Sequence, residues 1–124
     1  MYISIHADDL LFNIQQRFQE FYPYLKLEFP LAHKAAEKLN TIPARVPLKS
    51  MADLTEKKVI DVHPEKPVAQ LEEELKGVCG VNVTVLRRCG QSRHEPVCTP
   101  QTTLAHQNKQ GKLRTAFARV SDVY

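Results

Sequence analysis

The chain contains two stretches that resemble each other when the sequence is shifted by 57 residues. Residues 3–6 then align with residues 60–63, and both segments end in a histidine. Apolar residues align throughout the rest of the two stretches: Leu11 with Val68, Ile14 with Leu71, Phe18 with Leu75, Phe21 with Val78 and, after one inserted residue, Leu25 with Val83 and Leu27 with Val85. This repeat constrains the fold most, because each copy carries an apolar face that must be buried against other elements.

The first copy has the pattern of a strand, a helix and a second strand. Residues 2–5 alternate as a strand does, and the apolar residues from Leu10 to Phe21 recur at spacings of three and four, which predicts an amphipathic helix. Asp8 or Asp9 is expected to cap this helix, and Pro23 is expected to end it. Residues 24–29 alternate again and predict a strand with one solvated face.

The second copy follows the same plan. Residues 59–62 predict a strand, Pro64 and Pro67 mark the approach to a helix, and residues 81–85 predict the next strand. A turn at 89–92 and a return strand at 93–98 come next. A last helix is expected from Thr102 or Thr103 through about Phe117, with Gly111 lowering its helix propensity.

Residues 30–57 separate the copies. Their prolines, lysines and weak periodicity predict a long loop with a helical turn near residues 35–39. A structureless connection of this length is unusual in a compact domain, so the segment is either a mobile spacer, which we favour, or a place where function was added.

The order of elements predicts an α+β fold in one domain, residues 1–124. Its parts are repeat 1 (about 1–29), the loop 30–57, repeat 2 (about 58–87) and a C-terminal hairpin and helix (88–124). Two βαβ-like repeats are typical of a ferredoxin-like or related, mostly antiparallel sheet with helices on one face. A β-grasp-like or other mixed α+β arrangement is the alternative.

The C-terminal part of the chain also resembles a known family. Residues 81–90, Thr102–Leu104 and Gln107–Gly111 are similar to a pattern in a family of small bacterial α/β proteins without assigned function, and the resemblance lies mainly within residues 75–115. It implies the fold class and a bacterial source, and it carries no activity to transfer.

The composition predicts an ordinary small protein of the cytoplasm. The chain has 124 residues, a net charge of +3 and 43% hydrophobic residues. It has no apolar run long enough for a membrane span, and its N-terminus lacks the features of a secretory signal. An odd number of cysteines, three, favours reduced thiols and a cytoplasmic location.

Histidines and cysteines are the candidates for chemistry, and none reaches a recognisable motif. His6 and His63 each lie two residues from an aspartate, but equivalent ends of antiparallel neighbouring strands lie far apart. Cys79, Cys89, His94, Cys98 and His106 lack the close pairs of a zinc site. Cys89 with His94 as its base would make a thiol-dependent enzyme. We expect no catalytic residue, metal or cofactor, and keep the thiol enzyme as a remote alternative.

Positive charge is the strongest surface signal. Arg87, Arg88, Arg93 and His94 surround the expected hairpin, and Lys109, Lys112, Arg114 and Arg119 follow in the last helix. A solvated cationic face is the simplest interpretation of such a cluster. As a binding site, Arg87, Arg88, Arg93, His94, Lys109 and Lys112 would suit a protein partner, and the alternative is a weak, sequence-tolerant nucleic-acid binder.

Overall fold

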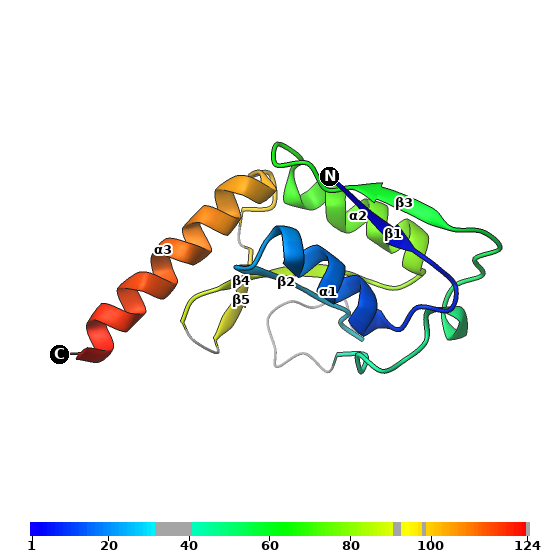
Figure 1. Cartoon of the computed structure of the whole chain (residues 1–124), viewed down its shortest axis with the longest axis horizontal. Helices are drawn as coiled ribbons and strands as arrows, with labels where there is room; N and C mark the ends of the chain where they lie inside the picture. Colours follow the sequence, from blue (N-terminus) through cyan, green and yellow to red (C-terminus); the bar gives the residue numbers. More distant parts are fainter. Residues whose placement is uncertain (32–40, 91–92, 98, 124) are drawn as a thin grey trace.

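The computed structural model of the chain describes residues 1–31, 41–90, 93–97 and 99–123, the last six by their backbone alone (Figure 1). It is an α+β protein with three α-helices and two antiparallel sheets. The elements in chain order are β1 (Tyr2–Ile5), α1 (Leu11–Phe21), β2 (Leu25–Glu28), the 3₁₀-helix η1 (Leu48–Ser50), β3 (Lys58–Asp61), α2 (Val68–Cys79), β4 (Thr84–Arg88), β5 (His94–Pro96) and α3 (Leu104–Val123).

The two sheets each join one strand from the first half of the chain to a strand from the second. Strand β1 pairs with β3, and the other sheet has the order β2–β4–β5. Ile3 lies opposite Ile60, and Leu27 lies opposite Val85. These are pairs of residues that the sequence comparison aligns with each other.

The expected ferredoxin-like plan differs from this arrangement, because that plan places the strands in one sheet. Side chains of α1 bind the backbone of both strands that flank it in the sequence. Arg17 Nη1 donates to the Ser4 carbonyl of β1 at 2.8 Å, and Gln15 Nε2 donates to the Leu27 carbonyl of β2 at 2.8 Å. The strands form two sheets, and α1 contacts one strand of each.

One apolar core joins both sheets to the helices. Helix α1 contacts β1 and β2, and α2 contacts β3 and β4. Tyr22 donates its buried hydroxyl to the Val62 carbonyl at 2.5 Å, and burial, with a smaller effect of Asp61, raises its pKa to about 12. The fully buried large side chains are Phe18, Phe29, Ile3, Ile5, Leu11, Ile14, Leu25, Leu27, Leu48, Leu71, Leu75 and Leu104.

The starts of α1 and α2 are held by backbone carbonyls from distant segments. The Leu11 and Phe12 amides of α1 donate to Val46 and Ala44, and residues between 42 and 54 pack on the core, unlike a mobile spacer. Residues 32–40 of the expected spacer lie outside the described residues. The Val68 amide of α2 donates to Thr102 in the same way. The expected cap at Asp8 or Asp9 is wrong, because the helix starts after Leu10. The helical turn expected near residues 35–39 lies outside the described residues.

Helix α3 starts one or two residues after the expected position and runs six residues beyond the expected end. Gly111 does not interrupt it but allows close packing. A Cβ atom at this position would lie 2.9 Å from Tyr24 Cβ and 3.2 Å from Arg87 Cγ. At about 1.5 Å per residue the helix is roughly 30 Å long, and its second half projects away from the sheets (Figure 1).

Candidate interaction surface

The three-stranded sheet has an inner face and an outer face, because successive side chains of a strand point to opposite sides. Leu25, Leu27, Val85 and Arg87 point inward, and the first three are fully buried. All three helices contact this inner side through Gln15 of α1, Glu72 of α2 and Gln107 of α3. The outer face carries the half-buried residues Lys26, Glu28, Leu86, Arg88, His94 and Pro96.

Arg87 belongs to the inner face and not to the expected surface. It is only 9% exposed, and its guanidinium donates to Gln107 Oε1 at 2.8 Å and to Glu95 Oε1 at 2.8 Å. Removing one partner of a buried, hydrogen-bonded charge pair is destabilising. Arg87 therefore joins the hairpin to α3. Replacing it would destabilise the fold, so a loss of binding in such a variant could not be assigned to the surface.

Glu95 receives positive charge from both the hairpin and α3. Besides Arg87, the guanidinium of Arg114 lies 3.4 Å from Glu95 Oε1. The hydrogen bond from Arg87 lowers the pKa of Glu95 most; burial opposes it, and the charges of Arg87, Arg114 and Arg93 lower the pKa further. Arg114 thus lies on the hairpin side of α3.

On the outer face, Lys26 of β2, Arg88 of β4 and His94 of β5 lie on the same side of the sheet, and Lys26 forms an ion pair with Glu28 at 2.8 Å. Arg88 is paired with His94 across the hairpin. The Arg88 guanidinium carbon lies 5.9 Å from the centre of the Tyr24 ring, and its Nε donates to the Gly90 carbonyl at 2.7 Å. Burial lowers the pKa of His94, and the charges of Lys26 and Arg88 lower it further, with Glu28 opposing. A net positive potential therefore acts on His94.

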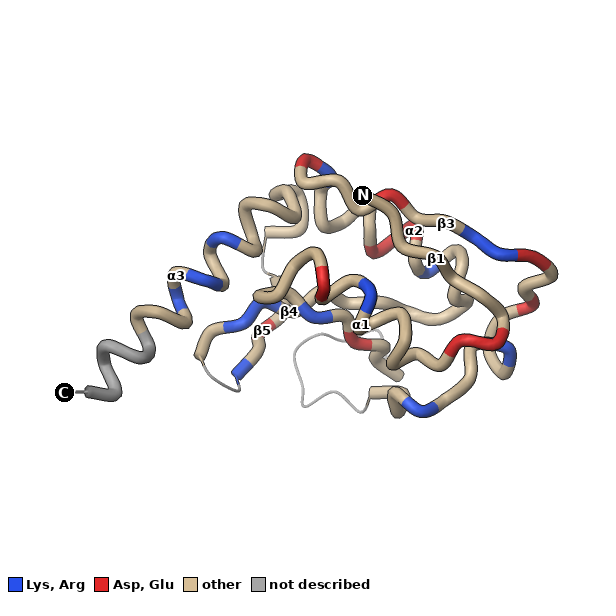
Figure 2. Tube along the Cα trace, viewed as in Figure 1, with Lys and Arg blue, Asp and Glu red and all other residues tan. Residues whose placement is uncertain are grey.

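The other predicted residues lie around this face or away from it. Arg93 is exposed at the hairpin turn. Lys109 and Lys112 are exposed on α3, and Lys109 is two residues before the buried Gly111, hence on the opposite side of the helix. Figure 2 shows the positive charges distributed between the β4–β5 region and α3. The structure brings Arg88 to His94 but does not join Lys109 and Lys112 to them.

Lys26 and Tyr24 complete the surface and were missed by the sequence reasoning. The alternation of residues 24–29 places Lys26 on the solvated side of β2, so a signal existed for Lys26. Tyr24 precedes the strand, and its Cβ faces Gly111 of α3. What was missing was the pairing of β2 with β4, which sets Lys26 opposite Leu86 and beside Arg88.

The histidines and cysteines that the sequence offered as candidates for chemistry do not come together in one site. His6 and His63 lie at opposite ends of the β1–β3 pair, as expected. Within the described parts of the chain, no three His, Cys, Asp or Glu residues are grouped to hold a metal ion. Burial raises the pKa of the Cys79 thiol to about 11, which suppresses its thiolate. Cys89 is a free thiol, and Cys98 lies outside the described residues.

A pocket of about 410 Å³ lies between the end of β2 and the end of α2. Its described lining includes Leu31, Ile42, Val81 and the charged Lys76. It is separate in sequence from Arg88, Arg93 and His94.

The structure is an α+β protein in which Lys26, Arg88 and His94 share one face of the three-stranded sheet. No helix in the described residues is long and apolar enough to cross a membrane. The chain matches no protein-family model, no curated protein and no solved structure in the comparisons made.

Proposed function

We propose that the chain is a non-catalytic protein-interaction module that binds its partner through the outer face of the β4–β5 hairpin. The contact residues are Arg88, Arg93 and His94, with Lys26 beside them. The observation that carries the proposal is that Lys26, Arg88 and His94 lie on the side of the sheet opposite to the three helices. Such a face attracts an acidic protein surface and orients it during encounter.

The test is capture of a partner by the full chain carrying Arg88→Glu with Arg93→Glu. We expect the partner to be lost, because both changes reverse charge on the proposed surface. Lys49→Glu with Lys58→Glu is the matched control, since both lysines are exposed elsewhere and the change in net charge is the same. Equal capture by wild type and both variants would contradict the proposal.

A weak nucleic-acid binder is the second candidate, favoured by the ring of Tyr24 next to Arg88. An aromatic ring beside a cation can stack a base while the cation meets a phosphate. Fluorescence anisotropy with a single-stranded oligonucleotide tests it. This candidate requires affinity that falls steeply with salt and falls again in Tyr24→Ala. An affinity that does not change with salt would exclude it.

We further infer that the two halves of the chain are an internal repeat arranged about a local two-fold axis. Aligned residues face each other in both sheets, Ile3 with Ile60 and Leu27 with Val85. Antiparallel pairing of equivalent positions is what two-fold packing of similar units produces. Helix α3 then extends one half beyond the other.

A further inference from the structure

Helix α3 exposes two large apolar side chains on the side away from the sheet. Leu113 is 43% exposed and Phe117 is 70% exposed. They follow the buried residues Gly111 and Thr115 by two positions each, which corresponds to about 200° around a helix. Their spacing of four places them one turn apart on one line. An i, i+4 pair of this kind is a common anchor in helix-mediated recognition.

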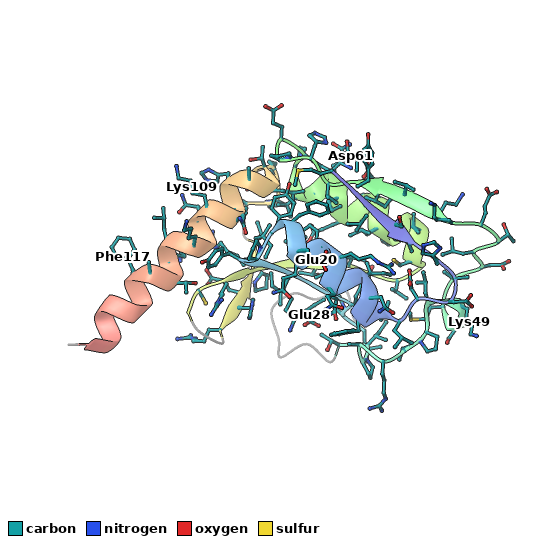
Figure 3. All side chains as sticks on the ribbon, viewed as in Figure 1. Glu20, Glu28, Lys49, Asp61, Lys109 and Phe117 are labelled. Atoms are coloured by element: carbon teal, nitrogen blue, oxygen red, sulfur yellow. The ribbon has the colours of Figure 1, made fainter. Side chains whose placement is uncertain are left out.

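Positive charge borders this apolar line. Lys109 is one turn before Leu113, and Figure 3 shows that Lys109 and Phe117 project from the same side of α3. Arg114 lies on the other flank, toward Glu95 of the hairpin. The sequence of α3 contains four Lys or Arg residues and a single acidic residue, Asp122.

We propose that the line formed by Leu113 and Phe117 is the docking site for an amphipathic helix of a partner protein, whose apolar residues are flanked by Glu or Asp. This inference rests on the proposed function that the chain binds a protein, and it supplies the chemistry of that partner. Apolar contacts would bury Leu113 and Phe117, and the acidic flanks would meet Lys109 and Arg114.

The charge of α3 argues against two other occupants. A second copy of this chain packed along α3 would bring Lys109, Lys112 and Arg114 of both copies into one interface, and like charges across an interface are unfavourable. A lipid surface is usually bound by a longer continuous apolar face, and vesicle binding is one of the outcomes of the test below.

The experiment measures binding of the full chain to a synthetic amphipathic helical peptide with leucines on one face and glutamates on both flanks. We expect Leu113→Ser with Phe117→Ser to weaken binding at least tenfold. Tyr2→Ser with Val59→Ser is the matched control, because these side chains of β1 and β3 are 65% and 50% exposed. All four side chains are exposed, so circular dichroism should show that both variants stay folded.

A second pair of measurements tests the charge. A peptide with glutamine in place of glutamate should bind at least tenfold more weakly. Lys109→Glu with Lys112→Glu should weaken binding of the acidic peptide to a similar extent, and it leaves the contact between Arg114 and Glu95 in place. Equal binding by the α3 variant and the control overturns the proposal. So does self-association of wild type that Phe117→Ser abolishes, or binding to phosphatidylglycerol vesicles in place of the peptide.

The hairpin variant separates this inference from the proposed function. Arg88→Glu with Arg93→Glu should leave peptide binding within about twofold of wild type, because neither residue is on α3. Loss of partner capture in the hairpin variant with normal peptide binding supports both ideas. Normal capture by the hairpin variant, together with loss of peptide binding by the α3 variant, would contradict the proposed hairpin surface. The same result would support the docking site at Leu113 and Phe117.

Discussion

The first helix of each half carries an ion pair at the same place, with the charges exchanged. Asp9 accepts two hydrogen bonds from Arg17, at 2.6 and 2.9 Å, and Lys66 forms an ion pair with Glu74. Asp9 is 8% exposed and Lys66 is 3% exposed. The 57-residue shift that aligns the apolar residues also aligns Asp9 with Lys66 and Arg17 with Glu74. If the two halves are the proposed repeat, the pair of opposite charges is kept at this position while the residue types are exchanged.

A double-mutant cycle tests this pair of charges. Asp9→Lys and Arg17→Glu should each destabilise the fold by about 1–3 kcal/mol, because each leaves two like charges at a buried pair. The double variant should recover part of that loss, since it recreates the arrangement of Lys66 and Glu74. Urea unfolding measures all four proteins. Additive losses in the double variant would show that the two charges do not interact.

The pH dependence of stability should report Asp9. Burial raises the pKa of its carboxyl, but the hydrogen bonds from Arg17 and the His6 amide, together with the Arg17 and His6 charges, outweigh burial and lower it. The carboxylate therefore stabilises the fold above the ordinary aspartate pKa, and this stabilisation is lost as the pH falls through the folded value. We expect Asp9→Asn to be less stable than wild type at pH 7, and the difference to shrink toward pH 3 in urea unfolding.

At the scale of elements, polar residues of the helices bind the strands directly. Gln15 of α1 donates to the Leu27 carbonyl, and Glu72 of α2 accepts from the Val85 amide at 2.9 Å. Gln15 and Glu72 are aligned by the shift of 57 residues, and Leu27 and Val85 are paired in the sheet. The two helices thus use equivalent positions to hold the same place in the sheet.

Replacement of Glu72 separates its charge from its hydrogen bond. Burial raises the pKa of Glu72, the Val85 amide opposes this, and Glu73 adds to it. Because the folded pKa is raised, ionisation of Glu72 opposes folding as the pH rises above the unfolded value. Glu72→Gln keeps an acceptor without the charge and should be at least as stable as wild type at pH 7. Glu72→Ala should lose about 1–3 kcal/mol. A Glu72→Gln variant as unstable as Glu72→Ala in urea unfolding would contradict this.

Two helical glycines should respond oppositely to alanine. Gly111→Ala introduces a Cβ at 2.9 Å from the Tyr24 carbonyl oxygen, whereas a Cβ at Gly77 meets nothing within 4 Å. Alanine is favoured over glycine inside a helix by about 1 kcal/mol. Thermal unfolding should therefore show Gly77→Ala stabilised and Gly111→Ala destabilised by about 1–3 kcal/mol through overpacking. A stabilised Gly111→Ala would mean that α3 is not packed on Tyr24.

The periodicity of the sequence predicted the helices and strands because it records which side chains are buried. It did not predict the two sheets, because alternation marks a strand and its buried face but does not say which strands pair. The inward position of Arg87 was available in principle: it continues the alternation of Val83 and Val85. Its basic side chain outweighed that pattern, and only the structure shows the Gln107 and Glu95 partners.

At the scale of the whole molecule, the two halves of the proposed repeat differ in the helix that follows their second strand. In the first half, Leu48 begins the short η1, and its amide donates to the Asp9 carbonyl. In the second half, Leu104 begins the long α3, and its amide donates to the Lys66 carbonyl. Equivalent anchoring therefore supports helices of very different length. The surfaces proposed for binding both lie on the extended half.

The link from Arg87 to both Gln107 and Glu95 has a mechanical consequence. Its hydrogen bonds hold the first part of α3 against the hairpin, while the second half of α3 projects away from the sheets. The hairpin face and the line formed by Leu113 and Phe117 are therefore carried on one connected part of the fold, joined by the side chain of Arg87.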